Sequence, residues 1–480
     1  MILKRYYDEK LAQASYLLGC AATGEALVVD PNRDVKQYIE AAAAEGLRLT
    51  HVTETHIHAD FVSGTNELVA ATGARAYLSD EGGPDWQYGF ADSIGAVLLK
   101  DGSEFSVGNI RVKAVHTPGH TPEHLSFVVT DTAGADKPMG VFTGDFVFVG
   151  DVGRPDLLEK AAGVAGTMEA GARQLFASVQ RIRELPDWIQ LWPGHGAGSA
   201  CGKSLGAVPS TTLGYEKLFN WAFSIASEDE FVEAVLAGQP EPPKYFAEMK
   251  RINREGPRVL GKLTAPPRQA PESLAKVLEE GRLVVDARRW KAYRAGYAPG
   301  TLNIPFNRSF TTWAGWLIPY DRDVYLLFAA KDEASVEAAT RDLAMIGLDR
   351  VAGYFTDDAL RAYADAGGEL HTLDEITAEE LRERYDDGDV TLIDVRGAGE
   401  WQSQHIPGVP NIPLGYLPER LDEVPRDRPI VVHCETGSRS AIAASLLAAN
   451  GYDDVMNFGG GFTEWSRAGH PTNEASSAAV

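Results

Sequence analysis

Residues 55–61 read Thr55-His56-Ile57-His58-Ala59-Asp60-Phe61. Two histidines and a carboxylate in so short a stretch usually bind a metal ion, because imidazole and carboxylate groups are common metal ligands. Further candidate ligands follow short apolar runs later in the chain: His120, Asp145 and His195. Strand-like runs that each end in a ligand bring the ligands together at one sheet edge. The pattern therefore predicts a metal site in an α/β domain.

Length and charge exclude several classes of protein. A chain of 480 residues predicts about three domains of ~150 residues each. The formal charge of −23 repels phosphate backbones, so nucleic acid is not an expected partner. No apolar run approaches the ~18 residues of a membrane-spanning helix, and the start lacks the apolar core of a signal peptide. We expect no membrane partner and a cytoplasmic location.

The metal-ligand stretches resemble the motifs of the metallo-β-lactamase superfamily. In that superfamily the first motif ends in one more histidine, which helps to bind a second metal ion, and Phe61 stands at that place here. The resemblance covers roughly residues 1–255 and implies an α/β protein with an αββα fold. Hydrolases of this superfamily commonly bind two ions, but Phe61 cannot ligate and breaks the second site, so the remaining set is expected to hold one ion. Further possible ligands, or residues that orient the ligands, are expected beside it. The implied ligands are His56, His120 and Asp145, and the residues beside them are His58, Asp60 and His195.

Two histidines and one carboxylate form the ligand set of non-haem Fe(II) oxygenases, which leaves positions open for substrate and O₂. Residues 150–156, which follow Asp145, are typical of the persulfide dioxygenases of this superfamily. That resemblance implies one Fe(II) per chain, with O₂ and a persulfide of glutathione, coenzyme A or a similar thiol as substrates. Arg154 is expected to bind the carboxylate of this carrier thiol or to shape its loop. Cys201 is expected near the mouth of the site, where it relays sulfur, forms a mixed disulfide with the substrate or is simply a packed or incidental thiol. Cys20 is expected in the core.

A Pro-rich linker at residues 264–271 marks a domain boundary. An internal repeat follows it, in which Asp286 and Asn303 recur as Asp394 and Asn411 at one and the same offset. Several motif pieces with a single offset indicate two homologous α/β domains. The predicted domains are therefore residues 1–258, 272–368 and 373–472.

The third domain contains a loop suited to binding anions. The apolar run 430–433 predicts a strand, and residues from Ala441 onward favour a helix. The loop between them starts at Cys434, so backbone N–H groups and the helix N-terminus converge on its sulfur. Together with the charge of Arg439, they favour a thiolate and an anionic adduct on it. The remaining loop residues are Glu435, Thr436, Gly437 and Ser438.

This loop resembles the active loop of the rhodaneses, which carry a sulfane sulfur as a cysteine persulfide. The resemblance implies that Cys434 and Arg439 are catalytic. Related loops of dual-specificity phosphatases have one more residue, which makes room for phosphate. No cysteine occurs between Cys201 and Cys434, so the middle domain is expected to be an inactive rhodanese-like domain.

Taken together, the three domains resemble a persulfide dioxygenase–rhodanese fusion. Such a protein oxidises a persulfide to sulfite and thiol, and it moves sulfane sulfur between persulfide, sulfite and thiosulfate during sulfide detoxification. We expect it to be a homo-oligomer. Two alternatives stay open: a zinc thioesterase like glyoxalase II fused to a sulfurtransferase, and a non-enzymatic sulfur-relay protein in which only Cys434 works.

Overall fold

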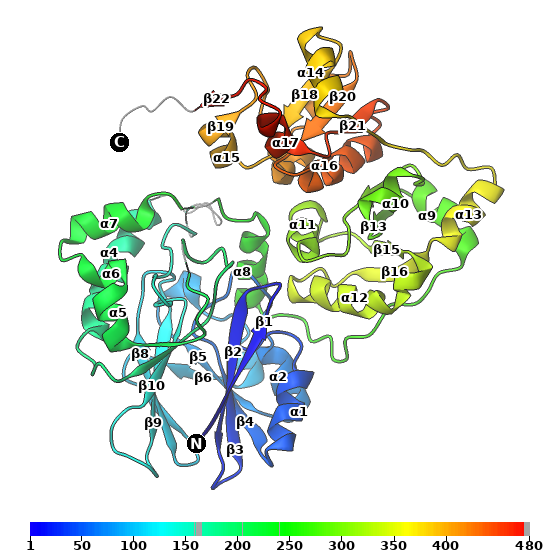
Figure 1. Ribbon diagram of the computed structural model, residues 1–480. Coiled ribbons are helices and arrows are strands. Elements are labelled where there is room, and N and C mark those ends of the chain that lie inside the picture. Colours follow the sequence, from blue (N-terminus) through cyan, green and yellow to red (C-terminus); the bar gives the residue numbers. More distant parts are fainter. Residues whose placement is uncertain (158, 160–165, 204, 240, 475–480) are drawn as a thin grey trace. The chain divides into compact units, whose positions relative to one another are not determined.

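The computed structural model describes residues 1–157, 159, 166–203, 205–239 and 241–474. It divides the chain into two compact units (Figure 1). Unit 1 comprises Met1–Leu263 and Ala344–Gly347, and unit 2 comprises Thr264–Leu343 and Leu348–Val480. The division falls where the Pro-rich linker begins, whereas the limits of three separate domains stay a prediction. Among the described residues, no helix is both long and apolar enough to cross a membrane.

Unit 1 contains two six-stranded sheets. The first, in chain order, consists of β1 (Ile2–Asp8), β2 (Gln13–Cys20), β3 (Glu25–Val29), β4 (Arg48–Thr53), β5 (Arg75–Ser79) and β6 (Val97–Leu99). The second has the order β12-β11-β10-β9-β8-β7 and consists of β7 (Glu104–Val107), β8 (Ile110–His116), β9 (Leu125–Asp131), β10 (Gly140–Gly144), β11 (Gln190–Pro193) and β12 (Thr211–Thr212). Parallel pairing of β3 with β4 and of β10 with β11 places the ends of these strands at one edge.

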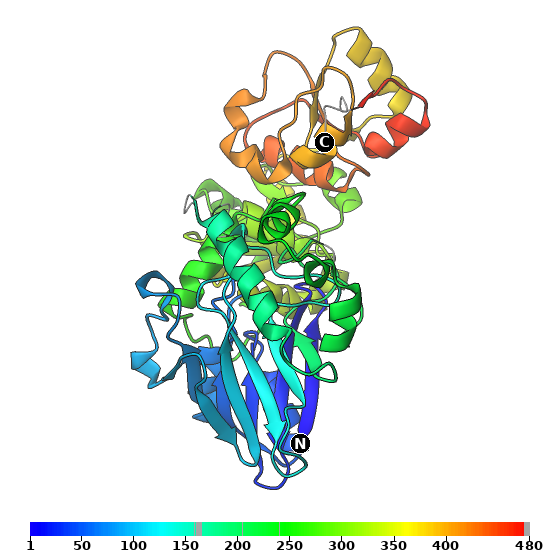
Figure 2. The same ribbon diagram turned by 90° about the vertical axis from the view of Figure 1, so that its left-hand side faces the viewer.

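Helices cover the outer face of each sheet (Figure 1). On the first sheet lie α1 (Lys36–Ala44) and α2 (Thr65–Thr72), and on the second lie α4 (Thr167–Ile182), α5 (Leu213–Phe219), α6 (Trp221–Ser224) and α7 (Glu228–Leu236). Figure 2 shows this unit from the side of α4–α7. The last helix of the unit is α8 (Tyr245–Glu255). These layers confirm the predicted αββα fold.

The alternation of side chains along the strands explains the layering. Neighbouring residues of a strand point to opposite faces, and in β2 Leu18 joins the core between the two sheets whereas Leu17 joins the core under α1 and α2. A third apolar cluster packs α4 and α7 on the second sheet, through Leu175 and Phe231. Every residue of β2 is buried, as expected for a strand covered on both faces.

Unit 2 contains two four-stranded parallel sheets. The first has the order β14-β13-β15-β16, with β13 (Leu283–Asp286), β14 (Thr301–Asn303), β15 (Val324–Phe328) and β16 (Val351–Thr356). The second has the order β17-β21-β20-β18, with β17 (Asp374–Glu375), β18 (Thr391–Asp394), β20 (Ile430–His433) and β21 (Val455–Asn457). A separate antiparallel pair joins β19 (Gln404–His405) to β22 (Asn473–Glu474).

The helices of unit 2 follow the same division. The first sheet is accompanied by α9 (Leu274–Glu279), α10 (Trp290–Arg294), α11 (Phe310–Leu317), α12 (Val336–Met345) and α13 (Asp358–Asp365). The second is accompanied by α14 (Ala378–Asp386), α15 (Ala398–Ser403), α16 (Ser438–Ala449) and α17 (Gly461–Arg467). Short 3-10 helices in the chain are η1 (Pro84–Trp86), η2 (Asp92–Ile94), η3 (Pro271–Ser273), η4 (Ala330–Ser335), η5 (Leu414–Glu419) and η6 (Leu421–Glu423).

The sequence repeat corresponds to a repeated hydrogen-bond network. Arg288 donates from Nε and Nη2 to the carboxylate of Asp286, and Asn303 Nδ2 donates to the carbonyl oxygens of both residues. The same bonds recur among Asp394, Arg396 and Asn411. Both Asp–Arg pairs are buried, and charged groups tolerate burial when they are paired and hydrogen-bonded in this way. The structure therefore confirms that the repeat folds twice.

Candidate functional site

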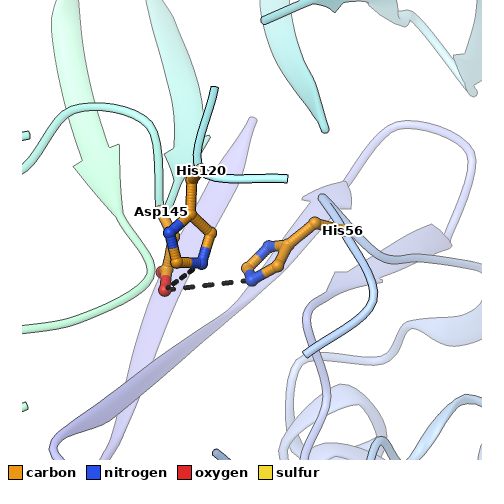
Figure 3. A group of neighbouring side chains, drawn as sticks. All are labelled: His56, His120 and Asp145. Carbon is orange, nitrogen blue, oxygen red and sulfur yellow. Dashed lines mark ion pairs between the residues drawn. The ribbon is translucent and has the colours of Figure 1, made fainter. Parts of the chain in front are cut away.

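Three of the predicted metal ligands meet in unit 1. His56 follows β4, His120 lies between β8 and β9, and Asp145 directly follows β10. The Oδ2 atom of Asp145 lies 3.8 Å from Nε2 of His56 and 3.5 Å from Nε2 of His120. Figure 3 shows both imidazole rings directed toward this carboxylate. The three side chains are buried, and their ligand atoms lie within 4.8 Å of one another.

The polar atoms of this group fit a divalent cation. Neither carboxylate oxygen of Asp145 has a hydrogen-bond partner, although both are buried, and such atoms carry a desolvation cost that a metal ion removes. Nδ1 of His56 lies 3.0 Å from the Thr55 hydroxyl, and Nδ1 of His120 lies 3.1 Å from the carbonyl oxygen of Arg154. Each Nε2 is thus left to bind a metal. Burial, together with the neighbouring histidines, lowers the pKa of His56 well below its ordinary value, which favours the neutral form that ligates.

His58 is held beside this group by a different partner. Its Nε2 lies 3.2 Å from Oδ1 of Asp30, and its ring packs against that of Phe61 in a tilted arrangement, with centroids 4.4 Å apart. Burial alone would lower the pKa of His58, but the carboxylates of Asp30, Glu54 and Asp60 together outweigh burial and raise the pKa to about 9. The His58 ring centroid lies 4.2 Å from that of His56. These contacts are those of a residue that fixes its neighbours in place.

Asp60 and His195 form a second cluster with Cys201. Nε2 of His195 lies 3.2 Å from Oδ2 of Asp60 and 3.5 Å from Oδ2 of Asp145. Cys201 belongs to the same buried group, whose ligand atoms all lie within 4.8 Å of one another. Cys201 thus lies beside the site, as expected, but it is buried rather than at an open mouth, since it is only 1% exposed. The chain after His195 folds back over the site, and Arg154 N–H donates to the carbonyl of Cys201.

Arg154 has the contacts of a residue that shapes its loop. Its guanidinium is fully buried and donates through Nε and Nη2 to Asp156, at 2.8 and 2.7 Å. Nη1 donates to the carbonyl of Ala200 at 3.2 Å. Of the two roles expected from the sequence, these bonds support loop shaping rather than binding of a substrate carboxylate, because the carboxylate that Arg154 binds is its own neighbour.

The sequence pattern did not reveal the residues that support the ligands. Asp30 accepts hydrogen bonds from the backbone N–H and the hydroxyl of Thr55, in addition to its contact with His58. His124 Nε2 accepts from the backbone N–H of Asp145, and its ring stacks on His56. His124 follows His120 in the same loop, so the histidine-rich spacing offered a signal, whereas Asp30 lies at the end of an unrelated strand.

Two residues with unusual backbone conformations contact the site. Among the described residues other than glycine, only Ala12 and Asp30 have positive φ, both 51°. The carbonyl oxygen of Ala12 lies 3.0 Å from Nδ1 of His195, and Asp30 orders Thr55 and His58 as described. Such a conformation costs about 1–2 kcal/mol in an L-residue. Strained residues cluster at functional sites, and here each of them holds a histidine of the site.

The loop after β20 presents Cys434 at the start of α16. Gly437 precedes this helix with φ of 86°, and a Cβ atom there would lie 2.0 Å from the carbonyl oxygen of Gly459. Only glycine fits this turn, which directs the N-terminus of α16 toward the loop. The hydroxyl of Ser440 donates to Sγ of the buried Cys434 at 3.5 Å.

The charged residues of the loop have fixed partners. Arg439 interacts with the Cys434 sulfur, as Ser440 does. Its Nη1 and Nη2 atoms donate to the Glu400 carboxylate at 2.6 and 2.7 Å. The side chain of Glu435 accepts from Arg396 at 3.0 Å and from Thr463 at 2.8 Å. Glu435 therefore links the loop to the repeated Asp–Arg network, and Glu400 holds Arg439 beside the sulfur.

A pocket of about 490 Å³ adjoins this loop within unit 2. Thr436, Gly437 and Ser438 line one side of it. The middle part of the chain lines the other, with Arg289, Trp290, Phe306, Asn307 and Trp313. The middle sheet thus contributes aromatic and cationic side chains to the surroundings of the sulfur loop.

The middle repeat places an apolar residue where the third domain has Cys434. Asp394 pairs with His433 across the sheet, and Asp286 pairs with Leu327 in the same way. Phe328, the next residue, therefore corresponds to Cys434, and it is buried. The described chain after β15 continues into η4 and not into a turn like that at Gly437. The middle repeat therefore lacks both the cysteine and the glycine turn of the loop after β20.

Comparisons with known proteins agree with this division. The family model "Metallo-beta-lactamase superfamily" matches residues 9–195, and "Rhodanese-like domain" matches residues 377–468. A solved metallo-beta-lactamase from Staphylococcus aureus subsp. aureus COL is 45% identical, with a TM-score of 0.66 over 74% of this chain and 99% of that chain. A sulfurtransferase of Allochromatium vinosum is 38% identical over 100 residues, 21% of this chain and 94% of the relative.

Two relatives of the first domain are named for different enzyme activities. A hydroxyacylglutathione hydrolase of Methylococcus capsulatus is 33% identical over 180 residues, which are 38% of this chain and 60% of that protein's length. A mitochondrial persulfide dioxygenase of Bos taurus is 28% identical over 200 residues, 41% of this chain and 68% of the relative. The chain thus spans only 60% of the length of the hydrolase.

Fold, sites and comparisons define an enzyme that joins an αββα metal-binding domain to a sulfurtransferase-type domain. The chain belongs to the metallo-beta-lactamase superfamily and carries a rhodanese-like domain C-terminal to the metal site.

Proposed function

We propose that the chain oxidises a low-molecular-weight persulfide to sulfite and thiol, and that Cys434 then moves sulfane sulfur between persulfide, sulfite and thiosulfate. The oxidation balances as RSSH + O₂ + H₂O → RSH + H₂SO₃. The observation that carries the proposal is the buried ligand group of two histidines and one carboxylate, formed where Phe61 replaces the histidine of a binuclear hydrolase site. A ferrous ion bound there would supply the redox chemistry by which O₂ reacts with sulfur.

The protein side chains prepare this site for an anionic substrate. His56 and His120 are held as neutral ligands by burial, which lowers the pKa of each. Asp145 contributes the single negative charge of the ligand set, so a divalent ion keeps a net positive charge that attracts a persulfide anion. His124 and Thr55 fix Asp145 and His56 by hydrogen bonds, which keeps the ligands in place before substrate arrives.

A second pocket is suited to the carrier thiol. It measures about 440 Å³ and adjoins the loop of His120 through Gly119 and Pro122. Lys250 and Arg254 of α8 line it, and Nζ of Lys250 lies 3.6 Å from the ring centroid of Trp86. Two cations and an aromatic face bind the carboxylates or phosphates of a small thiol such as glutathione or coenzyme A. The chain carries a net charge of −23, so this cationic pocket contrasts with the whole molecule.

Cys434 supplies the transfer chemistry. Its thiolate attacks the outer sulfur of a donor persulfide, the S–S bond breaks, and the carrier thiol leaves. Sulfite then attacks the outer sulfur of the Cys434 persulfide, which yields thiosulfate and regenerates the thiolate. The Ser440 hydroxyl, the N-terminus of α16 and Arg439 stabilise the anionic sulfur in both states.

Oxygen uptake by iron-loaded protein with glutathione persulfide tests the oxidation. His120→Ala should lower the rate by about 100-fold or more, because it removes a ligand. His51→Ala is a matched control, since His51 lies in β4 and stacks on Tyr77 away from the ligand group. Equal rates in the two variants would contradict the proposed metal site.

The hydrolase relative supports one second candidate, a zinc-dependent thioesterase. The two functions differ in metal and in substrate. Protein loaded with zinc that cleaves a glutathione thioester, and iron-loaded protein without persulfide-dependent oxygen uptake, would establish the thioesterase. The proposed oxidation instead requires uptake with iron and none with zinc.

A further inference from the structure

An aromatic patch is exposed on unit 1 at α5, which lies on the outer face of the second sheet (Figure 1). It comprises four side chains, Trp188, Tyr215, Leu218 and Phe219, which are 62%, 51%, 76% and 68% exposed. They are four of the eight large apolar side chains that are exposed in the described part of the chain. Exposed apolar side chains scattered singly are ordinary, whereas a concentration of this kind marks an interaction surface.

The four side chains form one surface. The three that belong to α5 share one face of this helix, because residues three and four positions apart are neighbours, and the ring centroids of Tyr215 and Phe219 lie 4.7 Å apart. The N–H of Gly214 donates to the carbonyl oxygen of Asp187 at 2.9 Å, which places Trp188 beside the start of the helix. The aromatic patch therefore presents three rings and one leucine together.

The opposite side of α5 is fixed to the loop that follows Asp145. The buried Glu216 carboxylate accepts from the N–H of Gly150 at 2.9 Å, and Asn220 Nδ2 donates to the carbonyl oxygen of Asp151 at 3.0 Å. The helix is thus held in place before any partner binds, and this lowers the entropic cost of association.

Charge around the aromatic patch favours a second copy of this chain as its partner. Residues 205–221 contain only two charged side chains. Glu216 is buried, and Nζ of Lys217 donates to Asp187 at 2.6 Å. The patch is therefore neutral on a chain whose net charge is −23, so it is a face on which two copies meet with little electrostatic repulsion. A membrane surface is a poorer partner, because binding to anionic lipid relies on free Lys and Arg side chains.

The size of the aromatic patch fits the centre of such an interface. An aromatic side chain contributes ~150–250 Å² when it is buried, so covering the exposed fractions of the three rings would remove about 360 Å² per copy from water. A stable interface buries about 800 Å² per partner, and Trp and Tyr are enriched at its core. The three rings thus supply nearly half of that area, in residue types that dominate binding.

We propose that the aromatic patch is the core of an isologous interface between two copies of this chain. In such an interface the same surface of both copies meets across a two-fold axis. The inference goes beyond the proposed function and does not depend on it, because it concerns association of folded chains and not chemistry at either site.

Sedimentation velocity of the full-length chain tests this interface. Wild-type protein should be self-associated with an even number of copies. Leu218→Glu should halve that number, because it places a carboxylate of each copy in the interface, and should raise the dissociation constant by about 30-fold or more, as expected for a central interface residue. Leu98→Glu is the matched control, since Leu98 is an exposed leucine of β6 outside the patch, and it should associate like wild-type protein.

Chemical cross-linking keeps the test independent of a loss of folding. The native cysteines are all buried, so a short bifunctional maleimide should join two copies of Leu218→Cys into a covalent dimer, and it should not do so in Leu98→Cys. Monomeric wild-type protein, Leu218→Glu that associates like wild type, or Leu218→Cys without a covalent dimer would each overturn the proposal. A wild-type monomer that floats with phosphatidylcholine vesicles would also overturn it, and would make the patch a lipid-binding surface. None of these readouts depends on persulfide oxidation.

Discussion

The two repeats of unit 2 share a scaffold but differ at the point of chemistry. Each has a four-stranded parallel sheet and a buried Asp–Arg pair bridged by an asparagine. Where the third domain has Cys434 before a tight glycine turn and a long helix, the middle repeat has Phe328 before a 3-10 helix. The fold therefore survives without Cys434 and the glycine turn beside it. It is stabilised by the sheet and by the Asp–Arg network, whereas the sulfur transfer that we propose requires a nucleophile and a turn that only glycine permits.

The largest effect should come from removing the nucleophile. Cys434→Ser should abolish formation of thiosulfate from persulfide and sulfite, since a hydroxyl does not carry sulfane sulfur. The substitution is nearly isosteric in a buried position, so the midpoint of thermal unfolding should change little. Transfer is measured as thiosulfate formed per minute. Thiosulfate formed at the wild-type rate by this variant would contradict the role of Cys434.

The turn before α16 should be nearly as important as the cysteine. In Gly437→Ala the new methyl group would lie 2.0 Å from the Gly459 carbonyl, so the loop must shift and transfer should fall strongly. The free energy of unfolding should drop by about 1–3 kcal/mol. Gly451→Ala is the control, because Gly451 has a similar φ of 74° with nothing within 4 Å. Equal transfer in both variants would show that the turn is not essential.

Replacing Glu400, the partner of Arg439, should have a smaller effect on transfer. Glu400→Gln weakens the two hydrogen bonds that hold Arg439, and transfer should fall up to about fivefold, as expected for a partly exposed ion pair. Glu423→Gln, in the exposed Arg420–Glu423 pair, serves as control and should leave transfer unchanged.

The same ion pair predicts a pH dependence. Arg439 lowers the pKa of Glu400 below its ordinary value of 4.5. A carboxyl group whose pKa is lowered by folding stabilises the folded protein fully at pH values above its ordinary pKa. This contribution is lost as the pH falls through the lowered pKa of the folded state. Wild-type transfer should therefore decline below pH 4.5, whereas Glu400→Gln should lack this component. Superimposable pH profiles of transfer for wild-type protein and Glu400→Gln would exclude a role of this ion pair in the pH dependence.

The smallest effect should come from adding a cysteine to the middle repeat. Phe328→Cys in the Cys434→Ser background should not restore thiosulfate formation, because the chain there lacks the glycine turn, Ser440 and Arg439. Loss of a buried aromatic ring should cost about 3–5 kcal/mol of stability, as for similar truncations. Recovered transfer would show that the nucleophile alone distinguishes the repeats.

The sequence predicted the ligands and the sulfur loop because both lie in short motifs after strands. Local spacing and the chemistry of the residue types were enough to predict His56, His120, Asp145 and Cys434. The supporting residues could not be found in this way. Asp30 and Ala12 reach the site through left-handed backbone conformations and pairing between distant strands.

The burial of Cys201 likewise could not be predicted from the local sequence. The position of Cys201 depends on how the chain folds back after His195, and spacing alone had placed it at the mouth of the site. The partners of Arg154, which favour loop shaping, also come from this fold-back, since one of them is the carbonyl oxygen of Ala200.

The central claim is that persulfide oxidation occurs at the His56, His120 and Asp145 group and is separate from Cys434. The most direct measurement is the oxygen consumed and the sulfite formed by iron-loaded Cys434→Ser protein supplied with glutathione persulfide. The account predicts uptake at the wild-type rate, with one sulfite formed for each O₂ and no thiosulfate formed by the enzyme. Absence of persulfide-dependent oxygen uptake in this variant, when wild-type protein consumes oxygen, would contradict it.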